Sequence, residues 1–151
     1  MSGVWAYEDF EVGQTIELGS RVVRAEEIIE FASEFDPQPF HLDEEAGRAS
    51  ILGGLSASGW HSCAMLMRML CDGLLLNSTS QGAPGIDALR WRKPVLAGDT
   101  LNARTTVLAK RVSQKRPSIG LVTCRHELIN QRGETVLEME NSVMFSRRDQ
   151  S

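Results

Sequence analysis

The sequence predicts an α+β domain in which a curved antiparallel sheet wraps around one long central helix. Residues 60–77 are apolar over most of a helical circumference, and a helix of that kind is expected in the middle of a fold. From Gly85 onward, apolar and polar residues alternate with the period of half-buried strands. Several strands after one buried helix favour an antiparallel sheet curled around that helix.

The size and charge of the chain limit what the domain can be. A chain of 151 residues with 42% hydrophobic content is long enough for one well-cored domain and too short for two ordinary ones. We therefore expect a single domain over residues 1–151, with its core at about 10–146. The net charge of −4 and the pI of about 5.4 argue against a nucleic-acid surface, which normally shows a basic stripe.

The first third of the chain predicts one strand and two short helices. Residues 13–23 indicate a strand, and residues 25–35 indicate an amphipathic helix because apolar residues recur there at helical spacing. These apolar residues are Ala25, Ile28, Ile29, Ala32 and Phe35. The helix is expected to end before Pro37, since the residue before a proline avoids the α conformation. A loop follows, and acidic residues in a first turn predict a second helix at 43–50.

The remaining elements follow from the glycine and serine loop at residues 51–59, which leads into the central helix at 60–77. Strands are then predicted at 86–95, 99–112, 119–131 and 134–147. The sequence QRG before the last strand is the clearest hairpin turn.

Composition also predicts where the protein resides. The amino terminus has no basic segment followed by an apolar one, so it does not resemble a secretory signal. The most apolar helical run, residues 64–76, is interrupted by Arg68 and Asp72 and is shorter than the roughly 20 residues that span a bilayer. Three cysteines without a CxxC pair, set in apolar patterns, indicate buried reduced thiols. We therefore expect a cytoplasmic protein without a membrane segment.

The loop FDPQPFHLD, residues 35–43, carries the first candidate chemistry. Asp36 and His41 lie five positions apart, and two prolines between them restrict the backbone. Each residue alone is more often structural: aspartate as a cap or turn residue, histidine as a satisfied polar group. A carboxylate beside an imidazole in a rigid loop can instead hold one water, with one group taking its proton and the other orienting it. The pair therefore predicts acid–base chemistry on a small electrophile.

The segment SASGW, residues 56–60, provides the second candidate feature. Unpaired N–H groups at a helix N-terminus can receive a developing oxyanion, and Gly59 allows close approach. Ser58 and Gly59 are therefore candidate oxyanion or substrate-binding residues. The structural alternative is ordinary N-capping by Ser56 or Ser58, with Gly59 as packing space.

Other catalytic classes have less support. No GxSxG elbow occurs, and the cysteines have no local signature of a nucleophile. A metal site is not expected, because His61 and Cys63 point to different faces of the predicted helix and no HExxH motif exists. His61 is expected to pack near the start of the central helix. His126, within a predicted strand, is expected to face solvent or a neighbouring strand.

Three segments together resemble the MaoC-like acyl dehydratases, the branch of the hot-dog fold that includes the R-specific enoyl-CoA hydratases. These segments are FASEFDPQPFHLD, ILGGLSASGWH and LRWRKPVLAGDTL, and the resemblance covers nearly the whole chain. The family's hydratase motif is Gly-Asp-x-Asn-Pro followed by an apolar residue and His. Asp36, Pro39, Phe40 and His41 occupy the corresponding positions.

The resemblance implies a hot-dog domain that adds water reversibly to the double bond of a 2-enoyl-CoA. Asp36 and His41 would hold the water, and the Gly59 N–H would bind the thioester oxygen. The acyl chain would lie in a tunnel beside the central helix, and the CoA thioester would be the substrate, with no cofactor or metal. The resemblance further implies a homodimer, or a higher oligomer of dimers, with sheets joined edge to edge. Arg90, Arg92 and Lys93 are candidates for contacts to the CoA phosphates.

The chain departs from the family motif at three positions. Phe35 replaces the glycine before the aspartate, Gln38 replaces the asparagine, and Ser58 stands where family members often have histidine. These departures bear on acyl preference. They also leave two alternatives open: an acyl-CoA thioesterase of the same fold, or a non-catalytic acyl-CoA-binding subunit.

Overall fold

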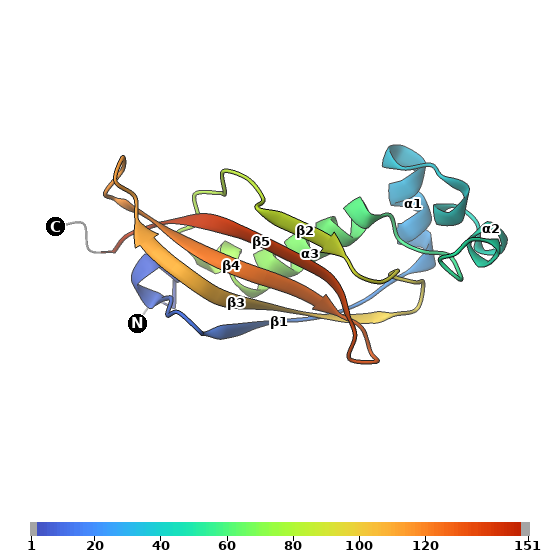
Figure 1. Cartoon of the computed structure of the whole chain (residues 1–151), viewed down its shortest axis with the longest axis horizontal. Helices are drawn as coiled ribbons and strands as arrows, with labels where there is room; N and C mark the ends of the chain where they lie inside the picture. The colour runs from blue at the N-terminus through green and yellow to red at the C-terminus, as the bar shows by residue number, and fades with distance from the viewer. Residues whose placement is uncertain (1–2, 149–151) are drawn as a thin grey trace.

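The computed structural model describes residues 3–148 and shows one five-stranded sheet curved around a central helix (Figure 1). The strands are β1 Thr15–Val22, β2 Ala88–Trp91, β3 Thr100–Val112, β4 Ile119–Ile129 and β5 Thr135–Ser146. The helices are α1 Ala25–Phe35, α2 Glu44–Ala49 and the central α3 Gly59–Gly73, with short 3-10 turns at Tyr7–Asp9, Pro39–His41 and Leu75–Asn77. The predicted α+β class and arrangement are confirmed.

The sheet has the order β1-β3-β4-β5-β2, and every neighbouring pair is antiparallel. Burial alternates along β4 and most of β3 and β5, so one face of the sheet packs on α3. Leu66 of α3, Val122 of β4 and Leu137 of β5 are fully buried in this core. The strand period in the sequence therefore reports the face that meets the helix.

Helix α3 is buried on one side only, which corrects the expectation of a helix enclosed all round. Leu66 is fully buried, whereas Trp60 is 60% exposed and Met67 is 46% exposed. The sheet covers a single side of the helix, and Figure 1 shows α3 running along it. Two of the apolar residues that recur at helical spacing in α1, Ile29 and Phe35, are likewise exposed.

The cysteines and the short strand β2 also differ from expectation. Only Cys124 is buried, while Cys63 and Cys71 are half-buried, and all three thiols are free. Strand β2 ends at Trp91, earlier than the predicted end at residue 95. The following N–H groups of Arg92 and Lys93 both donate to the Val136 carbonyl, so the regular ladder stops there.

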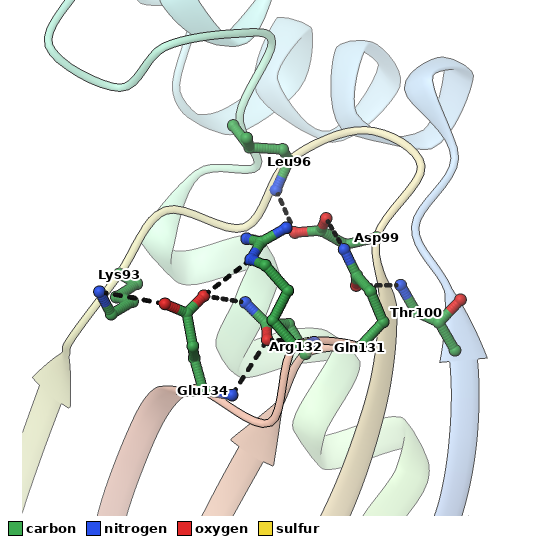
Figure 2. Close-up of polar contacts among 8 residues, drawn as sticks. Lys93, Leu96, Asp99, Thr100, Gln131, Arg132 and Glu134 are labelled. Carbon is green, nitrogen blue, oxygen red and sulfur yellow. Dashed lines mark hydrogen bonds and ion pairs between the residues drawn. The ribbon is translucent and has the colours of Figure 1, made fainter.

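The loop after β2 is tied to the β4–β5 hairpin, as Figure 2 shows. Asp99 accepts hydrogen bonds from the Leu96 N–H at 2.9 Å and from Gln131 Nε2 at 3.0 Å. Gln131 in turn accepts from the Thr100 N–H at 3.0 Å. Gly98 has a φ of +92°, a conformation that favours glycine. These contacts tie residues 96–100 to one another and to the β4–β5 hairpin.

The tied loop positions the segment that enters α3. The Ala57 N–H donates to the Val95 carbonyl at 2.8 Å, and the Ala97 N–H donates to the Leu55 carbonyl at 3.0 Å. Ser56 lies between these bonds in an isolated bridge with Leu96. Residues 55–57, which lead into α3, are therefore held on one side by backbone hydrogen bonds to residues 95–97.

His126 of β4 is buried and contacts side chains of the two neighbouring strands, β3 and β5. Of the two predicted positions, solvent-facing or cross-strand, the cross-strand one is confirmed. Its Nε2 donates to Asn141 Oδ1 at 2.9 Å, and its Nδ1 lies 2.8 Å from the Thr105 hydroxyl. The imidazole is 1% exposed. Burial lowers the pKa of His126, and the contact with Asn141 opposes this shift.

We expect stability to fall on mild acidification because of His126. The unfolded chain has an ordinary histidine pKa of about 6.5 and binds more protons than the folded protein below that value. The stability that neutral His126 contributes is therefore complete above the unfolded pKa and is lost as pH falls through the lower folded pKa. In urea titrations from about pH 7.5 to about pH 5.5, the decrease in unfolding free energy should be smaller in His126→Gln. An equal decrease in both proteins would exclude His126 as a source; His61, also shifted downward, accounts for a residual slope.

Candidate active site

A cavity of about 520 Å³ opens beside the N-terminus of α3, lined by the segments that follow α1 and α2 and by the end of β2 with the loop after it. Its polar lining includes Asp36, His41 and the backbone of Gly59. Its apolar walls are formed by Phe40, Ile51, Leu52, Trp60, Trp91 and Val95. A mostly apolar cavity with a few convergent polar groups is typical of a small-molecule site.

The DPQPFH segment places two polar side chains at this cavity. Asp36 ends α1, and its N–H donates to the Ala32 carbonyl at 2.8 Å. Pro39 opens a 3-10 turn that ends at His41, whose N–H donates to the Gln38 carbonyl at 2.9 Å. The turn brings the His41 imidazole to the carboxylate of Asp36, with Nε2 and Oδ2 3.5 Å apart. The predicted juxtaposition of these side chains is therefore present.

The tautomer of His41 follows from its second ring nitrogen. Nδ1 lies 2.6 Å from the Ser56 carbonyl oxygen, which can only accept, so Nδ1 carries the proton. In the neutral ring Nε2 is then an acceptor, and it faces the Asp36 carboxylate. His41 is 6% exposed, and Phe40 packs edge-on against its ring at 4.6 Å. The backbone of the segment before α3 therefore orients the imidazole.

Asp36 is held as a carboxylate by two donors. Ser58 Oγ donates to its Oδ2 at 2.6 Å, and Gln38 Nε2 donates to its Oδ1 at 2.7 Å. The Ser58 hydroxyl, and after it the Gln38 amide, keeps the pKa of Asp36 below its ordinary value. Asp36 is therefore a carboxylate at neutral pH. Asp36 and neutral His41 then present two neighbouring acceptors, Oδ2 and Nε2, to which a molecule with O–H donors, such as water, can donate.

Gly59 is the first residue of α3, so its N–H has no partner within the helix. A side chain at this position would collide with Trp91, because a Cβ there would lie 2.6 Å from the indole ring. Trp91 Nε1 also donates to the Gly59 carbonyl at 2.9 Å, and Trp60 packs edge-on against Trp91. Position 59 therefore requires a glycine, because the Trp91 indole leaves no room for a side chain there.

Ser58 is fully buried and does not line the cavity. Its hydroxyl is directed at Asp36 and also accepts from the Trp60 N–H at 3.3 Å. The expectation that Ser58 contacts the substrate is thus not supported by its position, whereas N-capping of α3 is confirmed.

The three basic candidates for phosphate contacts differ in position. Arg92 and Lys93 line the cavity, and Arg90 does not. Arg92 forms two hydrogen bonds with Glu138, both 3.2 Å long. Lys93 pairs with Glu134 at 3.3 Å (Figure 2).

The carboxylate that pairs with Lys93 belongs to Glu134, which two further side chains also bind. Hydrogen bonds from Asn130, Arg132 and Lys93 lower the pKa of Glu134 to about 2. Both cations that line the cavity, Arg92 and Lys93, are therefore paired within the chain.

Three contributors to the site were absent from the sequence-based prediction as functional residues. Ser56 orients His41 through its carbonyl oxygen, which no side-chain pattern reveals. Trp91 covers Gly59 from a strand 32 positions away. Gln38 was noted only as a departure from the motif, although its amide binds Asp36.

The residues considered for metal binding do not form a site in the structure. No group of three or more His, Cys, Asp or Glu side chains within residues 3–148 could hold a metal ion. His61 packs near the start of α3, as expected, and stacks on Phe31 at 4.8 Å. No helix within the same described range is long and apolar enough to cross a membrane.

Comparison with known proteins places this site in a family. The family model for the MaoC like domain matches residues 9–127, which include the whole cavity. The chain belongs to the MaoC-like family. The resemblance seen in the sequence is therefore confirmed, and the curved sheet around α3 is the hot-dog fold of that family.

Individual relatives agree with this assignment. A MaoC-like dehydratase from Rhodospirillum rubrum is 44% identical, with a TM-score of 0.84 over 95% of this chain and 98% of that one. The uncharacterized protein YdeM of Bacillus subtilis is 30% identical over 93% of this chain and 98% of its own length. The mesaconyl-CoA hydratase of Cereibacter sphaeroides is 43% identical over 60 residues, which are 40% of this chain and 17% of that enzyme.

Proposed function

We propose that this MaoC-like protein is a hydro-lyase that reversibly adds water to the double bond of a 2-enoyl-CoA. The observation that carries the proposal is the pair of acceptors, Asp36 Oδ2 and His41 Nε2, 3.5 Å apart at an apolar cavity. Membership of the MaoC-like family and the partial match to a mesaconyl-CoA hydratase support it.

In the proposed reaction one water donates its two O–H groups to Asp36 and His41. The thioester conjugated with the double bond makes the β-carbon electrophilic, and the water oxygen forms the new bond there as Nε2 takes its proton. The electron pair of the double bond moves toward the thioester oxygen, where the Gly59 N–H and the N-terminus of α3 stabilise the charge. The imidazolium then returns the proton to the α-carbon on the same face.

The local contacts support His41 as the base and Asp36 as the permanent anion. Asp36 has a lowered pKa because Ser58 and Gln38 donate to it, which makes it a weak base. His41 carries a proton on Nδ1, so in its neutral form the ring has Nε2 free to accept a proton. The carboxylate would orient the water and stabilise the imidazolium that forms.

We further propose a homodimer that completes the cavity wall. β2 lies at the end of the sheet and, within the described residues 3–148, pairs only with β5, so its outer edge is available to another strand. Trp91 of β2 is 46% exposed, and Trp60 of α3, which packs against it, is 60% exposed. A second copy joined at β2 would cover this apolar surface.

We also propose that the protein resides in the cytoplasm. Its proposed substrates are CoA thioesters, and its three cysteines are free thiols, as is usual in a reducing compartment.

The direct test follows loss of the enoyl-thioester absorbance while a thiol reagent reports free CoA. Straight-chain, branched and dicarboxylic 2-enoyl-CoA thioesters are offered to the wild-type protein. We expect absorbance loss without thiol release on at least one of them, and light scattering on the same sample should give a dimer. Thiol release would instead indicate a thioesterase, and CoA binding without turnover would indicate a binding subunit.

A further inference from the structure

We infer that Ser58 is a positioning residue that holds Asp36 in the water-binding orientation. The inference rests on the proposed hydratase function. It concerns the hydroxyl group of Ser58, which is fully buried and lies 22 positions from Asp36 in sequence.

The first argument is the direction of the hydrogen bond. An ionised carboxylate only accepts, so the contact of 2.6 Å between Ser58 Oγ and Asp36 Oδ2 uses the single proton of the hydroxyl. Hydrogen bonds between a hydroxyl and a carboxylate are short and about twice as strong as neutral ones. Ser58 therefore has no proton left for a substrate oxygen.

The second argument is the other contact of the same hydroxyl oxygen. Ser58 Oγ accepts from the Trp60 N–H in the first turn of α3 at 3.3 Å. A helical N–H, a hydroxyl and a carboxylate thus form one chain in which each bond polarises the next. The carboxylate is coupled to the same helix terminus that places Gly59 at the cavity.

The third argument is which carboxylate oxygen is held. Oδ2, the oxygen bound by Ser58, is also the one that lies 3.5 Å from His41 Nε2. Gln38 binds the opposite oxygen, Oδ1, at 2.7 Å from the exposed side. Gln38 is exposed and Ser58 is buried, so Ser58 is the more rigid of the two anchors. Removing its hydroxyl frees the carboxylate to turn away from Nε2.

The test separates the hydroxyl contact from the capping role of Ser58. Ser58→Ala removes both, whereas Ser58→Gly removes the hydroxyl but costs the helix little, because glycine is tolerated at the N-cap. Ser58→Thr retains the hydroxyl. Ser78→Ala is the matched control, because Ser78 Oγ also donates to an oxygen, the Leu75 carbonyl, and accepts from an N–H two residues on, beyond the other end of α3.

We expect kcat for enoyl-CoA hydration to fall about 10- to 100-fold in Ser58→Ala and in Ser58→Gly, the range for losing one hydrogen bond to a charged group. KM should stay unchanged because Ser58 does not line the cavity. Ser58→Thr should restore most of kcat, and Ser78→Ala should match wild type. An increase in KM with kcat retained would overturn the inference and make Ser58 a substrate contact.

A second readout does not depend on activity. The carboxyl carbon of Asp36 is followed by NMR in protein labelled with ¹³C-aspartate, and Asp36→Asn assigns its signal. The pKa of Asp36 should rise in both Ser58→Ala and Ser58→Gly, since the Ser58 contact is the largest cause of its lowered value. An unmoved titration in both variants would refute the positioning role. Wild-type protein that hydrates no thioester would refute the proposed function instead, and the titration would still decide the role of Ser58.

Discussion

Asp36→Asn and His41→Ala should each lower kcat for enoyl-CoA hydration by about 10³-fold, the central range for a lost acid–base group. The amide of asparagine can be accommodated by Gln38 and Ser58, but it carries no charge to orient water or to stabilise an imidazolium. Alanine at position 41 removes Nε2 and leaves the Ser56 carbonyl without its donor. Steady-state rates of absorbance loss, measured with the thioester that the wild-type protein hydrates fastest, would give both losses in kcat.

Two controls make this result specific. Asp43→Asn removes the same charge from the same loop, but Asp43 caps α2 through the Ala46 N–H, and asparagine caps equally well. Its kcat should equal that of wild type. Because Asp36 and His41 bind one water as a unit, the double variant should be little worse than either single variant. Multiplicative losses would show that the two side chains act separately.

Gly47→Ala should destabilise the protein by about 1–3 kcal/mol, although alanine is the better helix former. Gly47 is buried in α2 and faces the chain that leads to α3. A Cβ at Gly47 would overlap the Gly54 carbonyl and lie 2.7 Å from the Leu55 nitrogen, so backbone must move. The displaced segment leads directly to Ser56, which orients His41, so kcat should fall as well. Urea unfolding with an unchanged slope would measure the loss of stability.

Gly54→Ala is the matched control on the other side of the same contact. A Cβ at Gly54 would meet Leu96 and Glu44 side chains at 3.7 Å or more, which is ordinary van der Waals contact. Its stability should stay within about 0.5 kcal/mol of wild type. Equal stability of the two variants would show that the tight contact between α2 and the segment before α3 relaxes easily.

Elements with a local cause were predicted well. α1 spans residues 25–35 as expected, because apolar residues recur at helical spacing and Pro37 prevents its continuation. β3, β4 and β5 agree with their alternating patterns to within two residues at each end. The approach of Asp36 to His41 also has a local cause, since a short turn opened by Pro39 joins them.

Partners distant in sequence could not be predicted, because a periodic pattern reports which face is buried and not what covers it. The exposed side of α3 follows from a sheet that lies on one side only. Arg92 and Lys93, predicted as contacts for the CoA phosphates, instead form ion pairs with acidic residues of β5 and the β4–β5 hairpin, more than 40 positions away. The contact of Trp91 in β2 with Gly59 could not be predicted either, because the two residues are 32 positions apart.

The sequence by itself determined the α+β class, the extents of the main strands and α1, and the pair Asp36 and His41, because each depends on residue spacing and on the backbone limits of proline. Only the tertiary structure decided the hydrogen-bond partners of that pair. The Ser56 carbonyl selects the tautomer of His41 from 15 positions away, and the Ser58 hydroxyl lowers the pKa of Asp36 from 22 positions away. Hydrogen-bond partners of this kind exist only once the sheet, the tied loop and α3 are assembled.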